Sequence, residues 1–190
     1  MEMWFSEFHT PDVKHSIRVN RQLFSRQSDY QRIDIFETPE FGRVLTLDGN
    51  VMLTERDEFI YDEMITHVPM AIHKEAKEIM VIGAGDGGVV RELTRYDRVR
   101  HIDLVEMDPM VVEACRAYLP ENACRLDDRR VHLHYENALR FIRSVWPIGR
   151  IVYPRILWKL LQCVERGWNH GQSAGKSILR GRCTCNAAKP

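Results

Sequence analysis

The sequence predicts an α/β fold, in which a β-rich N-terminal region precedes a parallel sheet with helices. Three observations support this fold class. Short segments of alternating apolar and polar residues fill the first third of the chain. After Glu78, apolar segments of strand length alternate with helical segments, which is typical of parallel sheets with right-handed crossovers. A cluster of glycines separates the first apolar segment from the helix that follows it.

The N-terminal strands are predicted over residues 15–19, 32–36 and 43–54, where apolar and polar residues alternate. The last of these ranges is the clearest hairpin. It contains Asp48-Gly49, a pair able to adopt positive φ in a tight turn.

A helix is predicted to begin at Thr54, because Thr54 and Asp57 resemble a capping box with the shorter acid. Ile60, Met64 and Val68 would share one face of this helix. Pro69 is expected to help end it. The helix would connect the β-rich region to the parallel sheet.

The parallel sheet is predicted from strands over residues 78–83, 101–106 and 130–136. Helices over residues 87–96 and 109–119 would join them, with Pro109 suited to the first turn of the second helix.

The glycine turn has the pattern Gly83-x-Gly85-x-x-Gly88 between a strand and a helix. Alone this is a weak dinucleotide fingerprint, because such glycines also serve tight turns and close packing. Glu106 ends the next strand about twenty residues later, where an acid accepts hydrogen bonds from ribose hydroxyls. The turn and Glu106 are therefore expected at the same edge of the sheet.

Asp86 lies inside the glycine turn, where a dinucleotide would place its pyrophosphate. A carboxylate there repels phosphate and attracts a cation. The pattern favours a ligand with a ribose and a positive charge, such as S-adenosylmethionine and its relatives, over NAD. Asp86 could also cap the helix at Gly88, which is compatible with ligand binding.

The composition excludes several function classes. The formal net charge is zero, so the chain is not built to bind a polyanion such as nucleic acid. No apolar run approaches the length of a membrane span, and the N-terminus lacks a signal pattern, so a cytoplasmic protein is expected. The five cysteines form no CxxC pair, which favours free thiols over a zinc site, and no metal is predicted.

Residues 4–143 resemble the polyamine aminopropyltransferase family, the spermidine synthases. The resemblance is carried by WFSE, SDYQ, FGRVLTLDG, TERDEFIYDEM, THVP, VIGAGDGGVVRE and LVEMD, in the family's order and spacing. It implies a small N-terminal β-hairpin domain followed by a truncated Rossmann-like, methyltransferase-type parallel sheet. The expected division is residues 1–68, β-rich with the connecting helix; 69–143, nucleoside-binding; and 144–190, a divergent basic tail.

The resemblance implies transfer of an aminopropyl group from decarboxylated S-adenosylmethionine to putrescine, giving spermidine and 5′-methylthioadenosine. Decarboxylated S-adenosylmethionine is a co-substrate, and no separate cofactor is implied. The expected partners are these small molecules and, in the intact family form, a second copy of the chain in a homodimer. Neither nucleic acid nor a membrane is expected.

By the same resemblance, Gln31 would contact the nucleoside or its aminopropyl part, and Glu106 would bind the ribose. The remaining substrate-binding residues implied are Tyr61, Asp62, Gly83, Gly85, Asp86, Asn137 and Ala138. Three departures from the family pattern occur, and one of them is Ala84, which stands between Gly83 and Gly85 where the family has three successive glycines. Asp62 stands where bacterial members often have His or Gln, and Asn137-Ala138 replaces an Asp-Gly pair that meets the adenine.

The resemblance stops after Arg143, where the family continues with a strand and a D-S/T-x-D-P motif. The first aspartate of that motif is the expected base for the amine, so no catalytic residue is predicted here. Residues 144–190 carry 8 Lys and Arg but 1 acid, Glu165, which leads us to expect a frameshift near residue 145. The alternative is a genuine extension with a basic amphipathic helix.

Three functions are consistent with the sequence. The first is an aminopropyltransferase by descent, slow or inactive as written. The second is an S-adenosylmethionine-dependent methyltransferase, which would share the glycine turn and Glu106 but not the β-rich region. The third is a non-catalytic module that binds nucleosides or polyamines.

Overall fold

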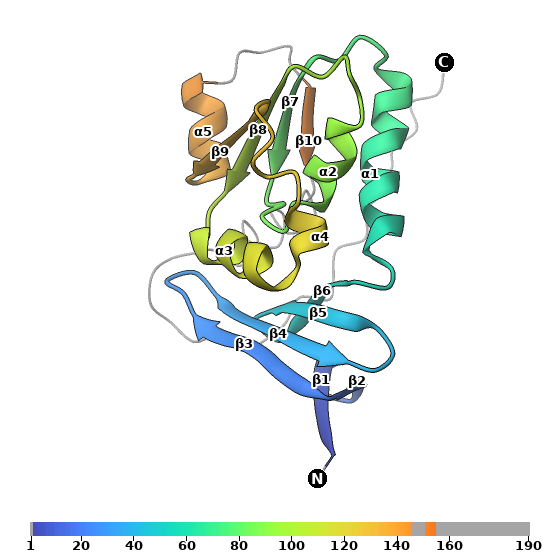
Figure 1. Cartoon of the computed structure of the whole chain (residues 1–190). Helices are drawn as coiled ribbons and strands as arrows, with labels where there is room; N and C mark the ends of the chain where they lie inside the picture. Colours follow the sequence, from blue (N-terminus) through green and yellow to red (C-terminus); the bar gives the residue numbers. More distant parts are fainter. Residues whose placement is uncertain (1, 146–150, 155–190) are drawn as a thin grey trace, which may run out of the picture. The chain divides into compact units, whose positions relative to one another are not determined.

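The computed structural model describes residues 2–145 and 151–154, and Figure 1 shows their arrangement. The N-terminal region forms two antiparallel sheets. One is a hairpin of β1 (Met3–Thr10) and β2 (Val13–Val19). The other has the order β3-β4-β5-β6, with bounds Arg21–Gln27, Arg32–Thr38, Gly42–Leu47 and Asn50–Thr54.

The predicted hairpin around Asp48-Gly49 is confirmed. Asp48 has φ 51° and Gly49 has φ 77°, so both central residues adopt the left-handed conformation of a two-residue hairpin turn. The strands β1 and β3 were not predicted, because their apolar and polar residues alternate less clearly. The fold class, β-rich first and parallel α/β second, is confirmed.

The connecting helix α1 spans Glu58–Ile72 and differs from the prediction at both ends. It begins after Asp57, and the Thr54 hydroxyl donates a hydrogen bond to the Asp57 carboxylate at 2.6 Å. The predicted capping box is therefore wrong, since these two side chains bond each other instead of backbone N–H groups. Pro69 lies inside the helix in its last turn, where it removes one backbone hydrogen bond but does not end the helix.

The α/β region contains a parallel sheet with the order β10-β7-β8-β9. Three strands match the predicted ones: β7 (Glu78–Ile82), β8 (His101–Glu106) and β9 (Val131–Tyr135). The helices are α2 (Gly88–Thr94), α3 (Pro109–Tyr118), α4 (Pro120–Ala123) and α5 (Ala138–Val145). The short helices α4 and α5 were not predicted.

The strand β10 (Ile151–Pro154) pairs with β7 and also was not predicted, because it falls in the segment interpreted as a divergent tail. Except for Ser144, Val145 and this strand, the predicted tail lies outside the described residues.

Two apolar cores hold the described residues together. One lies under α1 and α2 on one face of the parallel sheet and includes Met70, Val90 and Leu104. The other lies between the β3–β6 sheet and α3, where Ile33 and Ile35 pack with Val111. Figure 1 shows α3 between the parallel sheet and the β3–β6 sheet, so this helix packs against both. Within the described residues, no helix is long and apolar enough to cross a membrane.

Candidate functional site

The carboxyl edge of the parallel sheet brings the glycine turn and Glu106 together, as the sequence predicted. The strands β7 and β8 are adjacent and parallel, so their carboxyl ends meet at one edge. The Gly83 N–H donates to the Val105 carbonyl at 2.9 Å, which closes the turn onto β8. The Gly85 N–H donates to Glu106 Oε2 at 3.3 Å.

Glu106 is buried and anchored by backbone donors on both sides. Its Oε1 atom accepts a hydrogen bond from the Asp108 N–H at 3.0 Å, and Oε2 accepts from Gly85. Burial raises the pKa of Glu106, while these backbone hydrogen bonds act in the opposite direction. The carboxylate is therefore held in one orientation at the strand end, with acceptor capacity left for a hydroxyl donor.

The glycines of the turn serve different purposes. Gly83 and Gly87 have φ of 67° and 93°, a conformation that favours glycine. At Gly85 a Cβ would lie 3.0 Å from Glu106 Cγ, so a side chain there would crowd the acid. Ala84, which replaces a glycine of the family pattern, is not in the left-handed region, so this change is tolerated.

Asp86 is also buried, and its Oδ1 accepts a hydrogen bond from the Gly88 N–H at 3.0 Å. Asp86 thus accepts the first N–H of α2, as predicted, although the N-cap position itself is Gly87. Asp86 and Glu106 follow neighbouring strands at the same edge. A concave site shared by both carboxylates stays a prediction.

The N-terminal region carries Gln31 to the same edge. The Gln31 side-chain amide donates to Asp108 Oδ2 at 3.1 Å, and the Ser28 hydroxyl donates to the same oxygen at 2.6 Å. Asp108 Oδ1 caps α3 by accepting from the Met110 N–H at 3.0 Å. Gln31 and Glu106 are thus connected through Asp108.

Sequence reasoning missed Ser28 and Asp108 as members of the candidate site. A signal for Asp108 was present, because an Asp before Pro109 is a typical helix N-cap. Nothing in the local sequence indicated that Ser28 would reach it across the fold.

Tyr61 and Asp62 lie in different surroundings although they are neighbours on α1. Tyr61 is half exposed, with 46% of its surface accessible. Asp62 is fully buried, and its carboxylate lies against Gly88 at the start of α2. Their predicted contacts with a substrate stay predictions.

Asn137 follows β9 at the same carboxyl edge. Its Oδ1 accepts hydrogen bonds from the Leu139 N–H at 2.9 Å and the Arg140 N–H at 3.3 Å, so it caps α5, which begins at Ala138. Asn137 also lines a shallow, open hollow on the surface with Leu139, Arg140, Arg143 and Ser144. The side-chain NH₂ of Asn137 is a donor, where the aspartate of the family pattern would accept.

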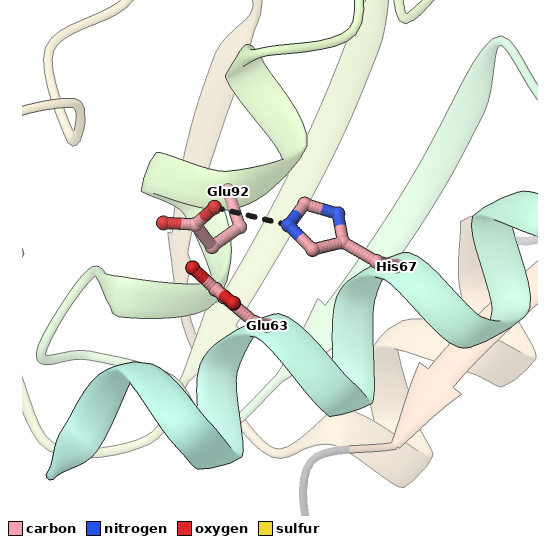
Figure 2. Close-up of side chains that lie close together, drawn as sticks. All are labelled: Glu63, His67 and Glu92. Carbon is pink, nitrogen blue, oxygen red and sulfur yellow. Dashed lines mark ion pairs between the residues drawn. The ribbon is translucent and has the colours of Figure 1, made fainter.

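A second cluster of titratable groups lies between α1 and α2 (Figure 2). One ligand atom from each of Glu63, His67 and Glu92 lies within 4.8 Å of the others, which is close enough for a metal ion. Glu92, however, accepts hydrogen bonds from Arg91 at 3.0 Å and Arg95 at 2.6 Å.

The hydrogen bonds and charges around Glu92 and His67 argue against a metal site at this cluster. Burial alone would raise the pKa of Glu92, but the hydrogen bonds from Arg95 and Arg91 outweigh it and hold the pKa below its ordinary value. His67 is also engaged, because its Nδ1 lies 2.7 Å from the Tyr96 hydroxyl. The guanidinium groups of Arg91 and Arg95 already pair with Glu92 and would repel a divalent cation. The cluster is therefore an ion-pair network between two helices.

Two family models match the chain. Residues 58–146 match the Spermine/spermidine synthase domain, and residues 3–55 match the Spermidine synthase tetramerisation domain. The two matches meet just before α1.

Individual proteins agree with these matches. The polyamine aminopropyltransferase of Lachnoclostridium phytofermentans is 58% identical over 144 residues, which are 76% of this chain and 51% of that protein. The protein of the same name from Alkaliphilus oremlandii is 57% identical over equal coverage. The chain thus spans about half the length of these relatives.

Solved structures show the same similarity. Spermidine synthase from Thermotoga maritima superposes with a TM-score of 0.73 at 44% identity, over 74% of this chain and 50% of that chain. A spermidine synthase in complex with the transition-state analogue AdoDATO superposes equally well.

Proposed function

Residues 3–146 of this chain belong to the spermidine synthase family, and on that premise we propose that they form the nucleoside-binding half of a cytoplasmic polyamine aminopropyltransferase. The co-substrate would be decarboxylated S-adenosylmethionine and the acceptor putrescine, with no further cofactor. One observation carries the proposal: the glycine turn donates its Gly85 N–H to the buried Glu106 carboxylate at 3.3 Å.

Glu106 would accept hydrogen bonds from the ribose hydroxyls of the nucleoside. This role is supported by the position of Glu106 at the end of β8 and by the backbone N–H groups that fix the orientation of its carboxylate. Gln31 would approach the nucleoside from the N-terminal region, since its amide is held at Asp108 beside Glu106. Asn137 and Ala138 would meet the adenine from the start of α5.

Asp86 would attract the positively charged substrates and disfavour a pyrophosphate. In the transfer, the lone pair of a putrescine nitrogen attacks the aminopropyl carbon bound to the sulfonium. The carbon–sulfur bond breaks, its electron pair stays on sulfur, and 5′-methylthioadenosine leaves as a neutral thioether. The new ammonium must then lose a proton to a base.

No residue of this chain is assigned as the general base. No D-S/T-x-D-P segment occurs in the sequence, and Asp86 already binds the Gly88 N–H. A correctly placed general base contributes roughly 10²–10⁴-fold. We therefore expect the chain as written to bind the nucleoside but to turn over slowly or not at all.

The first experiment compares ligands by calorimetry. 5′-Methylthioadenosine should bind the chain more tightly than NAD, because Asp86 disfavours pyrophosphate. Replacing Glu106 with Ala should weaken methylthioadenosine binding by about 1–3 kcal/mol, while replacing the exposed Glu113 with Ala should not. Tighter binding of NAD would indicate that the glycine turn belongs to a dinucleotide-binding site.

Product analysis separates the remaining functions. Labelled decarboxylated S-adenosylmethionine with putrescine should give traces of spermidine if the chain retains aminopropyl transfer. Methylated products from S-adenosylmethionine would favour a methyltransferase. Tight methylthioadenosine binding without any turnover would fit both an aminopropyltransferase that lacks its base and a binding module.

We also propose that the N-terminal strands assemble the chain into oligomers. The support is the match of residues 3–55 to a tetramerisation domain, together with exposed apolar side chains such as Trp4 and Phe8 on β1. A homodimer is the specific expectation, and light scattering at several concentrations tests it.

A further inference from the structure

One face of the parallel sheet carries a group of histidines around an acid. Successive side chains of a strand point to opposite faces, and Leu104 of β8 lies in the core under α1 and α2. His101 and Asp103 of β8 therefore point to the other face. The pairing of β8 with β9 places Asp103 opposite His132, and His134 follows on the same face (Figure 1). These three histidines and Asp103 are called the histidine cluster below.

Two imidazole nitrogens of the histidine cluster converge on one carboxylate oxygen. His134 Nε2 lies 2.8 Å from Asp103 Oδ1, and His101 Nε2 lies 3.1 Å from the same oxygen. In a tetrahedral zinc site, ligand atoms about 2.0–2.2 Å from the metal lie roughly 3.3–3.6 Å from one another. The two observed contacts are shorter than this by less than about 1 Å, so small side-chain movements would admit an ion.

The surroundings fix two of these side chains and leave the third able to adjust. The Asp103 side chain is only 10% exposed, and the His134 ring packs on Phe141 of α5 with a centroid distance of 4.4 Å. The His101 side chain is 36% exposed at the start of β8, so its ring has room to turn. The exposed His132 stacks on His101 with a centroid distance of 4.2 Å, which places a third imidazole beside the same two ligands.

The charges around Asp103 differ from those around Glu92. Within the part of the chain that the structure describes, the close polar contacts of Asp103 are with the imidazoles of His101 and His134, whereas two arginines pair with Glu92. A buried carboxylate is costly without a positive partner. Histidine supplies that charge only when it is protonated. A divalent cation supplies it directly and uses neutral imidazoles as ligands.

We propose that the histidine cluster binds a divalent cation of the class that prefers imidazole ligands, with Zn²⁺ as its probe. Asp103, His101 and His134 would be the ligands, and His132 would complete the coordination. Two imidazoles and a carboxylate suit zinc, nickel and copper, and they suit magnesium poorly. The bound ion would join β8 to β9.

This site is separate from the proposed nucleoside site. Asp103 precedes Glu106 by three residues, which is roughly 10 Å along β8, and the two side chains point to opposite faces of the sheet. Binding of the cation therefore has no part in the proposed transfer reaction, and its test does not depend on that reaction.

Calorimetry with Zn²⁺ tests the site on the full 190-residue chain, after accessible thiols are blocked so that cysteines cannot bind the ion. Each of the substitutions His101→Gln, His134→Gln and Asp103→Asn should weaken binding by roughly 10-fold or more, since even residues that only orient metal ligands change metal affinity by 10–100-fold. The matched control is His73→Gln, at an exposed histidine outside the cluster, which should bind Zn²⁺ as the wild type does. Methylthioadenosine binding should be unchanged in all four variants.

Chemical protection locates the ion in the wild-type chain, so this readout does not depend on how the variants fold. Zn²⁺ should protect His101 and His134 from diethyl pyrocarbonate, as measured by mass spectrometry of peptides, and Mg²⁺ at the same concentration should not. The proposal is overturned by any of four results: no binding of Zn²⁺, binding that the cluster substitutions leave unchanged, an equal loss in His73→Gln, or equal protection by Mg²⁺. The histidine cluster would then be a hydrogen-bond network only.

Discussion

Replacing Gly88 with Ala should destabilise the protein, although alanine is the better helix former. A Cβ at Gly88 would lie 1.8 Å from Asp62 Oδ2 and 2.6 Å from Asp62 Cγ. Asp62 is fully buried, so its carboxylate has little room to move aside. Overpacking of this kind costs about 1–3 kcal/mol, which exceeds the gain of up to about 1 kcal/mol from helix propensity.

A double-mutant cycle measures this effect by urea unfolding followed by circular dichroism. In the Asp62→Ala background the clash is removed, so Gly88→Ala should be neutral or stabilising by up to about 1 kcal/mol. The coupling energy between the two positions should be roughly 1–3 kcal/mol. An equal loss in both backgrounds, or a Gly88→Ala variant as stable as the wild type, would refute the reasoning.

Three further outcomes are expected. Burial raises the pKa of Glu106, so the contribution of this group to stability is present at acid pH and is lost as the pH rises above the ordinary pKa of a glutamate. The E106Q variant should therefore gain stability relative to wild type toward neutral pH. Paired urea titrations at several pH values measure this difference. Hydrogen bonding from Arg130 lowers the pKa of Asp128 to about 2. The contribution of Asp128 to stability is therefore present above about pH 4 and is lost between about pH 4 and 2. Because D128N lacks this titrating group, its stability should fall less steeply in acid unfolding. Gly49→Ala should cost about 1–2 kcal/mol in thermal unfolding, because Gly49 has φ 77° with nothing within 4 Å of a Cβ; no loss would contradict backbone strain as the cause.

One part of the candidate site was predictable, because it depends only on which residues end two adjacent parallel strands. Glu106 ends β8, and the glycine turn follows β7, so parallel pairing alone brings them to one edge. The link from Gln31 through Asp108 was not predictable, since it spans 77 residues and depends on how α3 packs against the N-terminal sheet.

The sequence by itself determined the order of β-rich and α/β regions, the parallel strands and the tight turn at Asp48-Gly49. These features depend on local periodicity and on backbone conformations that few residues adopt. Tertiary structure decided the rest. It buried Asp62 against Gly88, although Asp62 lies beside the half-exposed Tyr61 on one helix. It also left Met64 and Val68 exposed on α1, although their spacing is that of a core-facing stripe. Helical spacing shows which residues share a face, but only the elements packed around the helix decide which face meets water.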